Sequence, residues 1–426
     1  MRVLVLGAGG REHALAWKLR RSPSVARVLA APGSDGMARE ADCFGSVAAA
    51  DAAAVTALAR REGVDLVVVG PEDPLAAGIA DHLRGEGIAT FGPSAAAARL
   101  ESSKAFAKEF MRRHGIPTAG HAVFDELAAA RAHVRALGAP CVVKADGLAA
   151  GKGVTVCDGP EDAERALVEA MGERRFGAAG ARVVVEERLF GEEASYYALS
   201  DGTNVVPLAA AQDHKRALDG DRGENTGGMG AYSPAPVFDE AVEKRVLEEV
   251  VHPVVRGMAA EGHPFQGVLF VGLMIGPDRL PRAIEFNVRF GDPETQALLL
   301  RLDADLAALL DGAARGRLER AAAPAWRDAA VCVVVASGGY PRAYPTGLPI
   351  TGLEEAERDP DVVVFHAGTR RGPGGGFVTA GGRVLGVTAR GASVAEAQRR
   401  AYAACDRIRF EGMHLRRDIA ARALAR

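Results

Sequence analysis

The chain has 426 residues, of which 25% are charged and 48% are hydrophobic, and its formal net charge is -3. A general nucleic-acid binder normally carries a basic excess, so this charge argues against nucleic acid as a partner. No apolar run approaches 18 residues, and the N-terminus lacks a signal peptide, so we expect no contact with a membrane. The five cysteines form no CxxC pair, which is typical of reduced thiols. We therefore expect a soluble cytoplasmic protein, and the length favours about three domains.

The first hundred residues alternate between short apolar runs and helical patterns. We expect strands at RVLVLG, ARVLAAPG, DLVVVGPED and IATFGPS, and helices at REHALAWKLRR and LAAGIADHLRG. This alternation predicts an α/β domain with a doubly wound parallel sheet. The next helix, KAFAKEFMRRHGIP, ends at Gly115 and Pro117, which places a domain boundary between residues 100 and 120.

The middle of the chain changes pattern at about residue 140. CVVKA and VTVCD predict a hairpin with a long, flexible glycine tip, and further strands are expected at ARVVVEERL, EASYYALSDG and NVVPLAAAQ. The segment HKRALDGDRGENTGGMGAYSPAP shows no periodicity, and loops of this length are usually functional or disordered. A helix over residues 240–260 and two strands, GVLFVGLMIG and RAIEFNVRF, precede a small α+β unit in the last hundred residues.

The turn GAGGREH follows the first expected strand and matches the dinucleotide-binding fingerprint only in part. Glu12 stands where the third glycine belongs, and no acidic residue ends the second strand, which disfavours a nicotinamide-dependent enzyme. A glycine turn at a helix N-terminus still suits a phosphate group. A phosphate site and a purely structural turn both remain open here.

The glycine-rich stretch VVKADGLAAGKGV is not a P-loop, because three residues instead of four separate Gly147 from Gly151, and Gly153 follows Lys152. Lys144 lies in an apolar strand, where a buried lysine without a partner would be costly. We expect it to meet a phosphate, over which the glycine tip closes its amides. An edge lysine that reaches solvent is the alternative.

A candidate metal site lies in AIEFNVRFGDPE, whose residues alternate as in a strand. Glu285, Asn287 and Arg289 share one face, opposite an apolar face. A carboxylate and an amide oxygen suit Mg²⁺, and the arginine suits an anion, although an exposed strand face gives the same pattern. A helix is expected to follow, with Asp292 as its N-cap and Pro293 at its first position.

The motifs together resemble one family, the phosphoribosylamine–glycine ligases of the ATP-grasp superfamily. In order they are GxGGREHAL, VGPE, SSKAF, VVKADGLAAGKGV, EExLxGEEAS, QDHKR, NTGGMGAYSPAP and EFNVRFGDPETQ, so the resemblance runs from residue 1 into the C-terminal part. It implies a Rossmann-like domain over residues 1–102 and a two-subdomain ATP-grasp core over 103–325. The flexible lid subdomain would span about 120–190, and a small α+β domain would span 326–426.

The resemblance also implies an activity. ATP, glycine and 5-phosphoribosylamine would give ADP, phosphate and glycinamide ribonucleotide through a glycyl phosphate, in de novo purine biosynthesis. The cofactors would be ATP and Mg²⁺ or Mn²⁺, and the chain would act as a monomer with transient contacts to neighbouring purine-pathway enzymes. The alternative is another ATP-grasp carboxylate–amine ligase, or a carboxylase, of purine metabolism.

Site residues follow from the same resemblance, motif by motif. Those expected around ATP are Lys104, Lys144, Gly147, Gly151, Lys152 and Gly153 at the phosphates, Glu186, Glu187 and Leu189 at the adenine, and Glu192 or Glu193 at the ribose. Those expected to bind the metal are Glu285 and Asn287. Those expected around the substrates or in catalysis are Gly9, Gly10, Asp213, Lys215, Asn225 and Arg289. One departure is that the strand GVLFVGLMIG carries no carboxylate, so one metal ion would be held incompletely or with substrate oxygens.

Overall fold

The computed structural model describes residues 1–148 and 153–425. Two of the expected site residues, Gly151 and Lys152, lie outside this part of the chain. Within it, no helix combines the length and the apolar character that crossing a bilayer requires.

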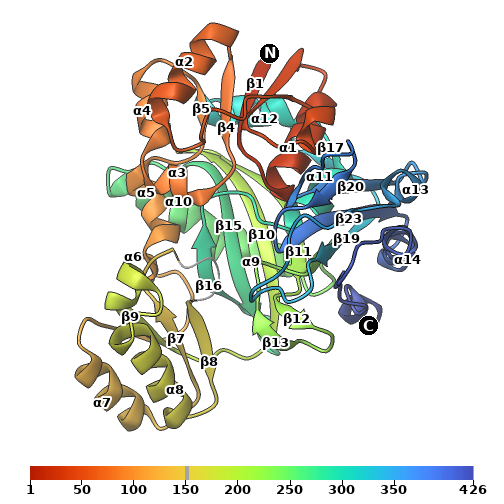
Figure 1. Ribbon diagram of the computed structural model, residues 1–426. Helices are drawn as coiled ribbons and strands as arrows, with labels where there is room; N and C mark the ends of the chain where they lie inside the picture. Colours follow the sequence, from red (N-terminus) through yellow and green to blue (C-terminus); the bar gives the residue numbers. More distant parts are fainter. Residues whose placement is uncertain (149–152, 426) are drawn as a thin grey trace.

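The N-terminal region forms the predicted parallel sheet, with strand order β3-β2-β1-β4-β5 (Figure 1). Its elements are β1 (Arg2–Gly7), α1 (Gly10–Arg20), β2 (Arg27–Pro32), β3 (Asp42–Cys43), α2 (Ala52–Glu62), β4 (Leu66–Val69), α3 (Glu72–Ala76), α4 (Ile79–Gly85), β5 (Thr90–Phe91) and α5 (Ala95–Ser102). The single helix predicted at LAAGIADHLRG is wrong. Gly78 adopts the left-handed region (φ +86°) and separates α3 from α4.

The lid region is a four-stranded antiparallel sheet of order β6-β9-β7-β8, which stands apart from the rest of the molecule in Figure 1. Its elements are β6 (His121–Phe124), α7 (Leu127–Leu137), β7 (Cys141–Ala145), β8 (Val154–Cys157), α8 (Pro160–Leu167) with the π-helical turn η2 (Val168–Gly172), and β9 (Val183–Glu187). The predicted hairpin is confirmed, since Cys141 pairs with Cys157 and Lys144 with Val154. Helix α6 (Lys104–Arg113) connects this region to the N-terminal sheet.

A central antiparallel sheet of eight strands has the order β16-β15-β10-β11-β14-β19-β23-β20. Its strands are β10 (Glu192–Asp201), β11 (Val205–Asp213), β14 (Gly230–Ser233), β15 (Gln266–Ile275), β16 (Pro281–Asn287), β19 (Ala329–Ala336), β20 (Val362–His366) and β23 (Arg383–Gly391). The pairing of β14 with β19 makes the sheet continuous into the last hundred residues. Strands of the middle and of the last hundred residues therefore belong to one sheet.

The remaining elements cover this sheet or connect its strands. They are α9 (Glu240–Val246), the π-helical turn η4 (Leu247–Val251), α10 (His252–Ala260), α11 (Glu294–Arg301), β17 (Leu302–Asp303), α12 (Leu306–Ala314), β18 (Ala325–Trp326), α13 (Leu353–Ala356), β21 (Thr369–Arg371), β22 (Phe377–Thr379), α14 (Val394–Cys405) and α15 (Ala421–Leu424). The helix predicted over residues 240–260 is confirmed as the helical run from α9 to α10.

Two local predictions are wrong. The segment after β11 is not without regular structure, because β12 (Arg216–Leu218) and β13 (Arg222–Asn225) form a hairpin. These strands have three and four residues, too few for alternation to stand out in the sequence. Helix α11 begins at Glu294, one residue later than predicted, and Pro293 takes the N-cap position. Asp292 does not cap it; its carboxylate accepts from the Gln296 side chain at 2.8 Å.

Candidate active site

Strand β7 of the lid meets β16 of the central sheet at Lys144. Its Nζ donates to the Ile284 carbonyl at 3.2 Å and forms an ion pair with Glu186 Oε1 at 2.9 Å. The other carboxylate oxygen of Glu186 pairs with Lys108 Nζ at 2.8 Å, and no side chain of the three is more than 3% exposed. The buried charge of Lys144 is thus paired with Glu186, and Glu186 is also paired with Lys108.

Lys108 is a residue that sequence reasoning missed. It also donates to Thr118 Oγ1 at 2.7 Å. Burial lowers the pKa of Lys108 to about 8, although the charge of Glu186 opposes the change. The available signal was its spacing, because it lies four residues after Lys104 in α6 and residues four apart share a helix face.

Lys104 lies at the start of α6, beside the glycine tip. Its Nζ donates to the Gly147 carbonyl at 3.0 Å, and burial lowers the pKa of Lys104 while Glu285 opposes that change. Asp146, which was not expected in the site, accepts from the Ser103 hydroxyl at 3.0 Å and the Ala105 amide at 3.1 Å. The first residues of the tip are therefore fastened to α6, and Gly153 lies at its other end, directly before β8.

The expected adenine and ribose residues lie between the end of β9 and the start of β10. The carboxylate of Glu186 is taken up by the two lysines, so its side chain is not aimed at open space. Glu187 is exposed at the end of β9, where its carboxylate accepts from the Gly120 amide at 3.3 Å, and Leu189 is half-buried just beyond. Glu192 and Glu193 open β10, opposite Ile275 and Met274 of β15.

Glu285 and Asn287 occupy the same side of β16, as predicted from the alternation. Burial alone would raise the pKa of the Glu285 carboxyl, but Lys215, Lys144 and Lys104 together lower it below its usual value. Within the described residues, no three His, Cys, Asp or Glu side chains are grouped to enclose an ion. One carboxylate and one amide oxygen fit a hard divalent cation whose remaining ligands are oxygens of a bound molecule.

Arg289 lies beyond the end of β16 and is braced by acidic side chains of the N-terminal region. Its guanidinium contacts Glu72 at 3.2 Å and Glu101 at 2.9 Å. It also donates to the Asn287 side chain and the Phe290 carbonyl, both at 3.3 Å. Burial would lower the pKa of Arg289, but the two carboxylates raise it above its usual value. Four acceptors thus share the five N–H donors of this arginine, which fixes its orientation.

Asp213 ends β11 and Lys215 follows two residues later, where it forms an ion pair with Glu193. Partial desolvation of the Lys215 side chain, which is 44% exposed, opposes its charge, but Asp213 and Glu193 raise the pKa of Lys215 well above its usual value, and Glu285 adds to the effect. The sequence reasoning missed Glu294 of the RFGDPETQ motif, which is 4% exposed and accepts from the Ser195 hydroxyl at 3.2 Å. The carboxylates of Asp213, Glu193 and Glu294 near Lys215 offer acceptors to an ammonium ion.

Asn225 lies at the end of β13, opposite Arg216 in the hairpin register. It is half-buried and stands two residues from Gly227 in the NTGGMG segment. The hairpin therefore places Asn225 beside Arg216, the residue that follows Lys215.

The glycine turn at Gly9 and Gly10 is filled by a side chain of its own helix. The Glu12 carboxylate accepts from the Gly9 amide at 2.8 Å. A Cβ atom at Gly7 or Gly70 would come within 2.6 Å or 2.3 Å of the Glu12 side chain, so these glycines make room for it. Glu12 thus occupies the place of a dinucleotide pyrophosphate, which argues against the nicotinamide alternative. A Cβ at Gly10 would lie 2.9 Å from Gln296, which places the turn beside α11.

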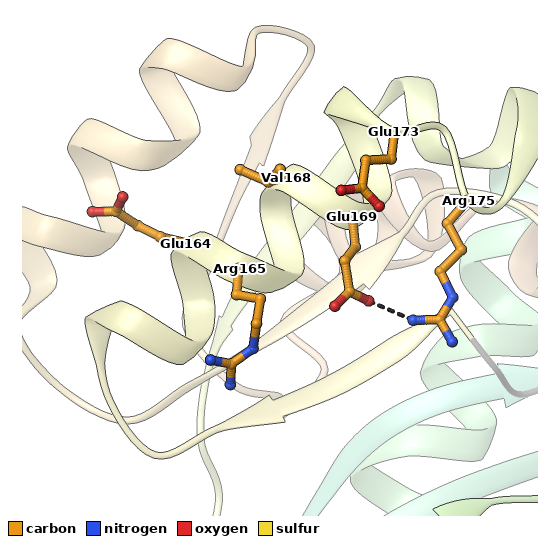
Figure 2. Close-up of a pocket in the computed structure, with 6 residues that line it drawn as sticks. All are labelled: Glu164, Arg165, Val168, Glu169, Glu173 and Arg175. Atoms are coloured by element: carbon orange, nitrogen blue, oxygen red, sulfur yellow. Dashed lines mark hydrogen bonds and ion pairs between the residues drawn. The ribbon is translucent and has the colours of Figure 1, made fainter.

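A separate hollow of about 660 Å³ lies along α8 and η2 of the lid (Figure 2). It is lined by Glu164, Arg165, Val168, Glu169, Glu173 and Arg175. Glu169 pairs with Arg175, and Glu164 pairs with two arginines of α7. None of the expected site residues lines it, and four of its five charged side chains are held in ion pairs.

Glu294→Gln is expected to flatten the pH dependence of stability. Burial raises the pKa of Glu294 to about 7, and the charge of Asp213 adds to the shift. The folded protein therefore keeps a proton that the unfolded chain releases above about pH 4.5. The resulting stabilisation is complete below that pH and is lost as the pH rises through about 7, by up to about 3 kcal/mol.

Urea unfolding at about pH 5 and about pH 7.5 measures this effect. The unmodified protein should lose more free energy of unfolding between the two pH values than Glu294→Gln does. Equal losses in the two proteins would show that Glu294 holds no such proton.

Comparison with known proteins matches three family models along the chain. They are described as phosphoribosylglycinamide synthetase N domain (residues 1–101), ATP-grasp (A) domain (102–295) and C domain (330–422). A protein of Allochromatium vinosum named phosphoribosylamine–glycine ligase is 53% identical, over 100% of this chain and 99% of its own length. One of the same name from Mesorhizobium japonicum is 55% identical, with the same coverage.

Solved structures show the same relationship. The crystal structure of phosphoribosylamine–glycine ligase from Thermotoga maritima superposes with a TM-score of 0.85 at 34% identity, covering 99% of this chain and 100% of its own. Biotin carboxylase from Campylobacter jejuni gives a TM-score of 0.73 at 16% identity, covering 97% of this chain and 92% of its own. The latter likeness concerns the fold alone.

Proposed function

Because the chain belongs to the phosphoribosylamine–glycine ligase family, we propose that it joins glycine to 5-phosphoribosylamine at the expense of ATP, giving glycinamide ribonucleotide for de novo purine biosynthesis. A carboxylate oxygen of glycine attacks the γ-phosphorus of ATP, and ADP leaves. The amine nitrogen of phosphoribosylamine then attacks the carbonyl carbon of the glycyl phosphate. The C–O bond breaks, and phosphate departs with one oxygen of glycine.

The observation that carries this proposal is the position of Glu285. Its carboxylate interacts with the positive charges of Lys215, Lys144 and Lys104. Residues of the ATP motifs and of the substrate motifs therefore converge on one strand, as phosphoryl transfer between two bound molecules requires.

We assign the ATP phosphates to Lys104 and Lys144, with the glycine tip as a lid and Lys152 within it. Glu187 and Leu189 would contact the adenine, and Glu192 or Glu193 the ribose. The shared partner of Lys144 supports this assignment. If Lys144 turns to a phosphate, Glu186 keeps its ion pair with Lys108, so the exchange leaves no buried carboxylate unpaired.

Glu285 and Asn287 would hold the divalent cation, which we propose to be Mg²⁺ or Mn²⁺. Such an ion neutralises charge on the transferring phosphoryl group when it is bound. Strand β15 offers no carboxylate to it, so oxygens of the bound substrates would supply the other ligands.

The substrates would lie next to this strand. We place glycine and phosphoribosylamine among Asp213, Lys215, Asn225 and Arg289, with the turn at Gly9–Gly10 along one edge. Glu294 joins this set from the structure. The acidic side chains suit the ammonium group of glycine, and the fixed guanidinium of Arg289 suits an anionic group.

The organisation of the molecule is also proposed on this basis. We divide the chain into residues 1–102, 103–325 and 326–426, which the matched family regions support. A cytoplasmic monomer, in transient contact with neighbouring purine-pathway enzymes, is part of the same proposal.

The test of the proposed function is the substrate requirement for ADP release. Release should stay near background with glycine or phosphoribosylamine alone, and should be strong when both are present. Robust release with bicarbonate in place of glycine would contradict the assignment and favour a carboxylase.

A further inference from the structure

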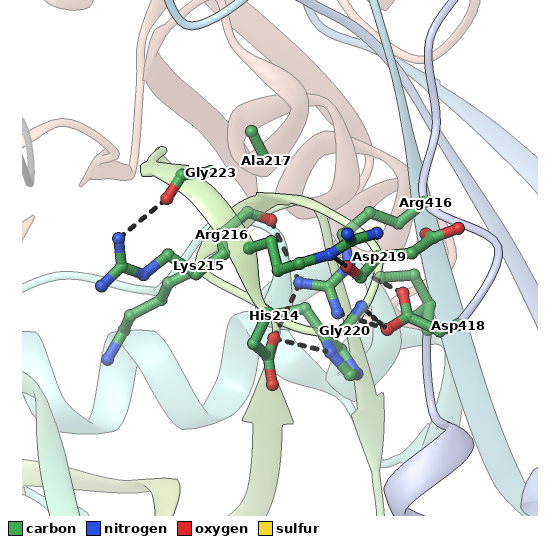
Figure 3. Close-up of polar contacts among 12 residues, drawn as sticks. His214, Lys215, Arg216, Ala217, Asp219, Gly220, Gly223, Arg416 and Asp418 are labelled. Carbon is green, nitrogen blue, oxygen red and sulfur yellow. Dashed lines mark hydrogen bonds and ion pairs between the residues drawn. The ribbon is translucent and has the colours of Figure 1, made fainter.

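The segment that carries Asp213 and Lys215 is fastened to the end of the chain. We call residues 213–225 the substrate loop and residues 414–422 the C-terminal clamp (Figure 3). Contacts between them are distributed along both segments: His414 with the Ala217 carbonyl (2.8 Å), Arg417 N–H with Asp219 (2.8 Å), Ala420 N–H with His214 Nε2 (3.1 Å), and Arg422 with the Asp213 carbonyl (2.9 Å).

Arg416 lies at the centre of these contacts and is completely buried. Its Nη1 donates to the Arg216 carbonyl at 3.1 Å and pairs with Asp221 at 2.8 Å. Its Nε and Nη2 grip both oxygens of Asp418 at 2.8 Å and 2.7 Å. Asp418 in turn accepts from the Gly220 amide at 2.8 Å. One guanidinium thus ties β12 and the turn that follows it to the clamp.

The turn of the substrate loop has a backbone conformation that the contacts with Arg416 stabilise. Gly220 and Asp221 both adopt the left-handed region, with φ of +69° and +52°. A non-glycine residue there is strained and keeps the conformation only when its surroundings impose it. The ion pair of Asp221 with Arg416 is a contact that imposes it.

The clamp also decides which way the loop's side chains point. In an extended segment, consecutive side chains point to opposite sides. His214 is 2% exposed and faces the clamp, through its bond with Ala420. Asp213 and Lys215 therefore face the other way, where Lys215 meets Glu193. Figure 3 shows Lys215 extending away from Arg416 and Asp418.

We propose that Arg416 is a positioning residue for ligation: it holds the substrate loop so that Asp213 and Lys215 face the glycine and phosphoribosylamine site. This inference rests on the proposed function, because those two residues are assigned to the substrates there. Among the residues that the structure describes, Arg416 contacts none that is assigned to ATP. Its loss should therefore affect the substrate steps and spare nucleotide binding.

The test compares substitutions within the clamp in the full-length protein. Arg416→Gln should lower kcat/KM for phosphoribosylamine by about 10- to 100-fold, the range expected when reacting groups are displaced by about 1 Å. The dissociation constant of ATP should change by less than about twofold, because Lys104 and Lys144 lie elsewhere. Arg416→Lys keeps the charge and loses the planar fork, so it should give an intermediate value.

Two further variants separate positioning from general damage. Asp221→Asn breaks the same bridge from the half-exposed side of the loop, and it should lower kcat/KM in the same selective way even if Arg416→Gln does not fold. Arg417→Gln is the matched control. Its side chain is 55% exposed and pairs with Asp406, away from the loop, so its kinetics should equal those of the unmodified protein.

Either of two results would overturn the inference. One is unchanged kcat/KM in folded Arg416→Gln and Asp221→Asn proteins, and the other is a loss of ATP binding as large as the loss of kcat/KM. An unmodified protein that shows no turnover dependent on phosphoribosylamine would contradict the proposed function itself, and this inference with it.

Discussion

Replacing Glu285 by glutamine is expected to reduce ligase turnover by about 100- to 1,000-fold, the size of losing one electrostatic contact with a transition state. Glutamine has almost the same volume as glutamate, so the fold should survive. The carboxylate is the charged one of the two proposed metal ligands on β16, and its removal leaves Lys104, Lys144 and Lys215 around a neutral site. Part of the activity should return as the Mg²⁺ concentration is raised, if weaker metal binding is the main loss.

The matched control for this variant is Asp278→Asn, the same chemical change at the exposed turn of the β15–β16 hairpin. Asp278 pairs with Arg282 at 2.9 Å and accepts from the Leu280 amide at 3.1 Å. Both contacts are local to this turn, so its replacement should leave turnover and its Mg²⁺ dependence unchanged. The measurement is turnover against Mg²⁺ concentration for the three proteins. Unmodified behaviour of Glu285→Gln at limiting Mg²⁺ would place the metal on another element.

Lys144→Met is expected to weaken ATP binding by about 10- to 100-fold, which corresponds to about 1.5–3 kcal/mol for one charge-assisted contact with a phosphate. Methionine keeps most of the aliphatic stem and removes the charge. Glu186 retains its pair with Lys108, so the substitution does not leave a buried carboxylate alone. Equilibrium titration with ATP measures the change.

Lys108→Met serves as the comparison, because Lys108 is the other lysine that pairs with Glu186. The two variants should lose similar thermal stability, since each leaves Glu186 with one cation. Only Lys144→Met should lose ATP affinity to the stated extent. Equal ATP affinity in Lys144→Met and the unmodified protein, with the fold intact, would refute the role of Lys144.

Sequence patterns with a local physical cause were predicted well. The N-terminal parallel sheet follows from alternating apolar runs and helical patterns, and the β7–β8 hairpin follows from two apolar runs around glycines. The shared face of Glu285 and Asn287 follows from the period of a strand. Each of these features is decided within about ten residues, where propensity and periodicity act.

Features decided by distant contacts were not predicted. Glu186 is held by lysines from α6 and β7, and no local pattern announces that Lys108 belongs with them. Glu12 breaks the dinucleotide-binding fingerprint in the sequence, but in the structure its carboxylate binds the glycine turn of that motif at the Gly9 amide. The hairpin of the substrate loop was missed because its strands are short, and it is held by Arg416, which lies 200 positions after Arg216.

The central claim is that glycine is activated at its carboxylate by transfer of the γ-phosphoryl group. Glycine labelled with ¹⁸O in its carboxylate tests this claim most directly, when it is supplied with ATP and phosphoribosylamine and the released phosphate is analysed by mass spectrometry. Because the phosphate leaves with one oxygen of glycine, each phosphate formed should carry one ¹⁸O atom. Ligation that yields phosphate without ¹⁸O would contradict the account.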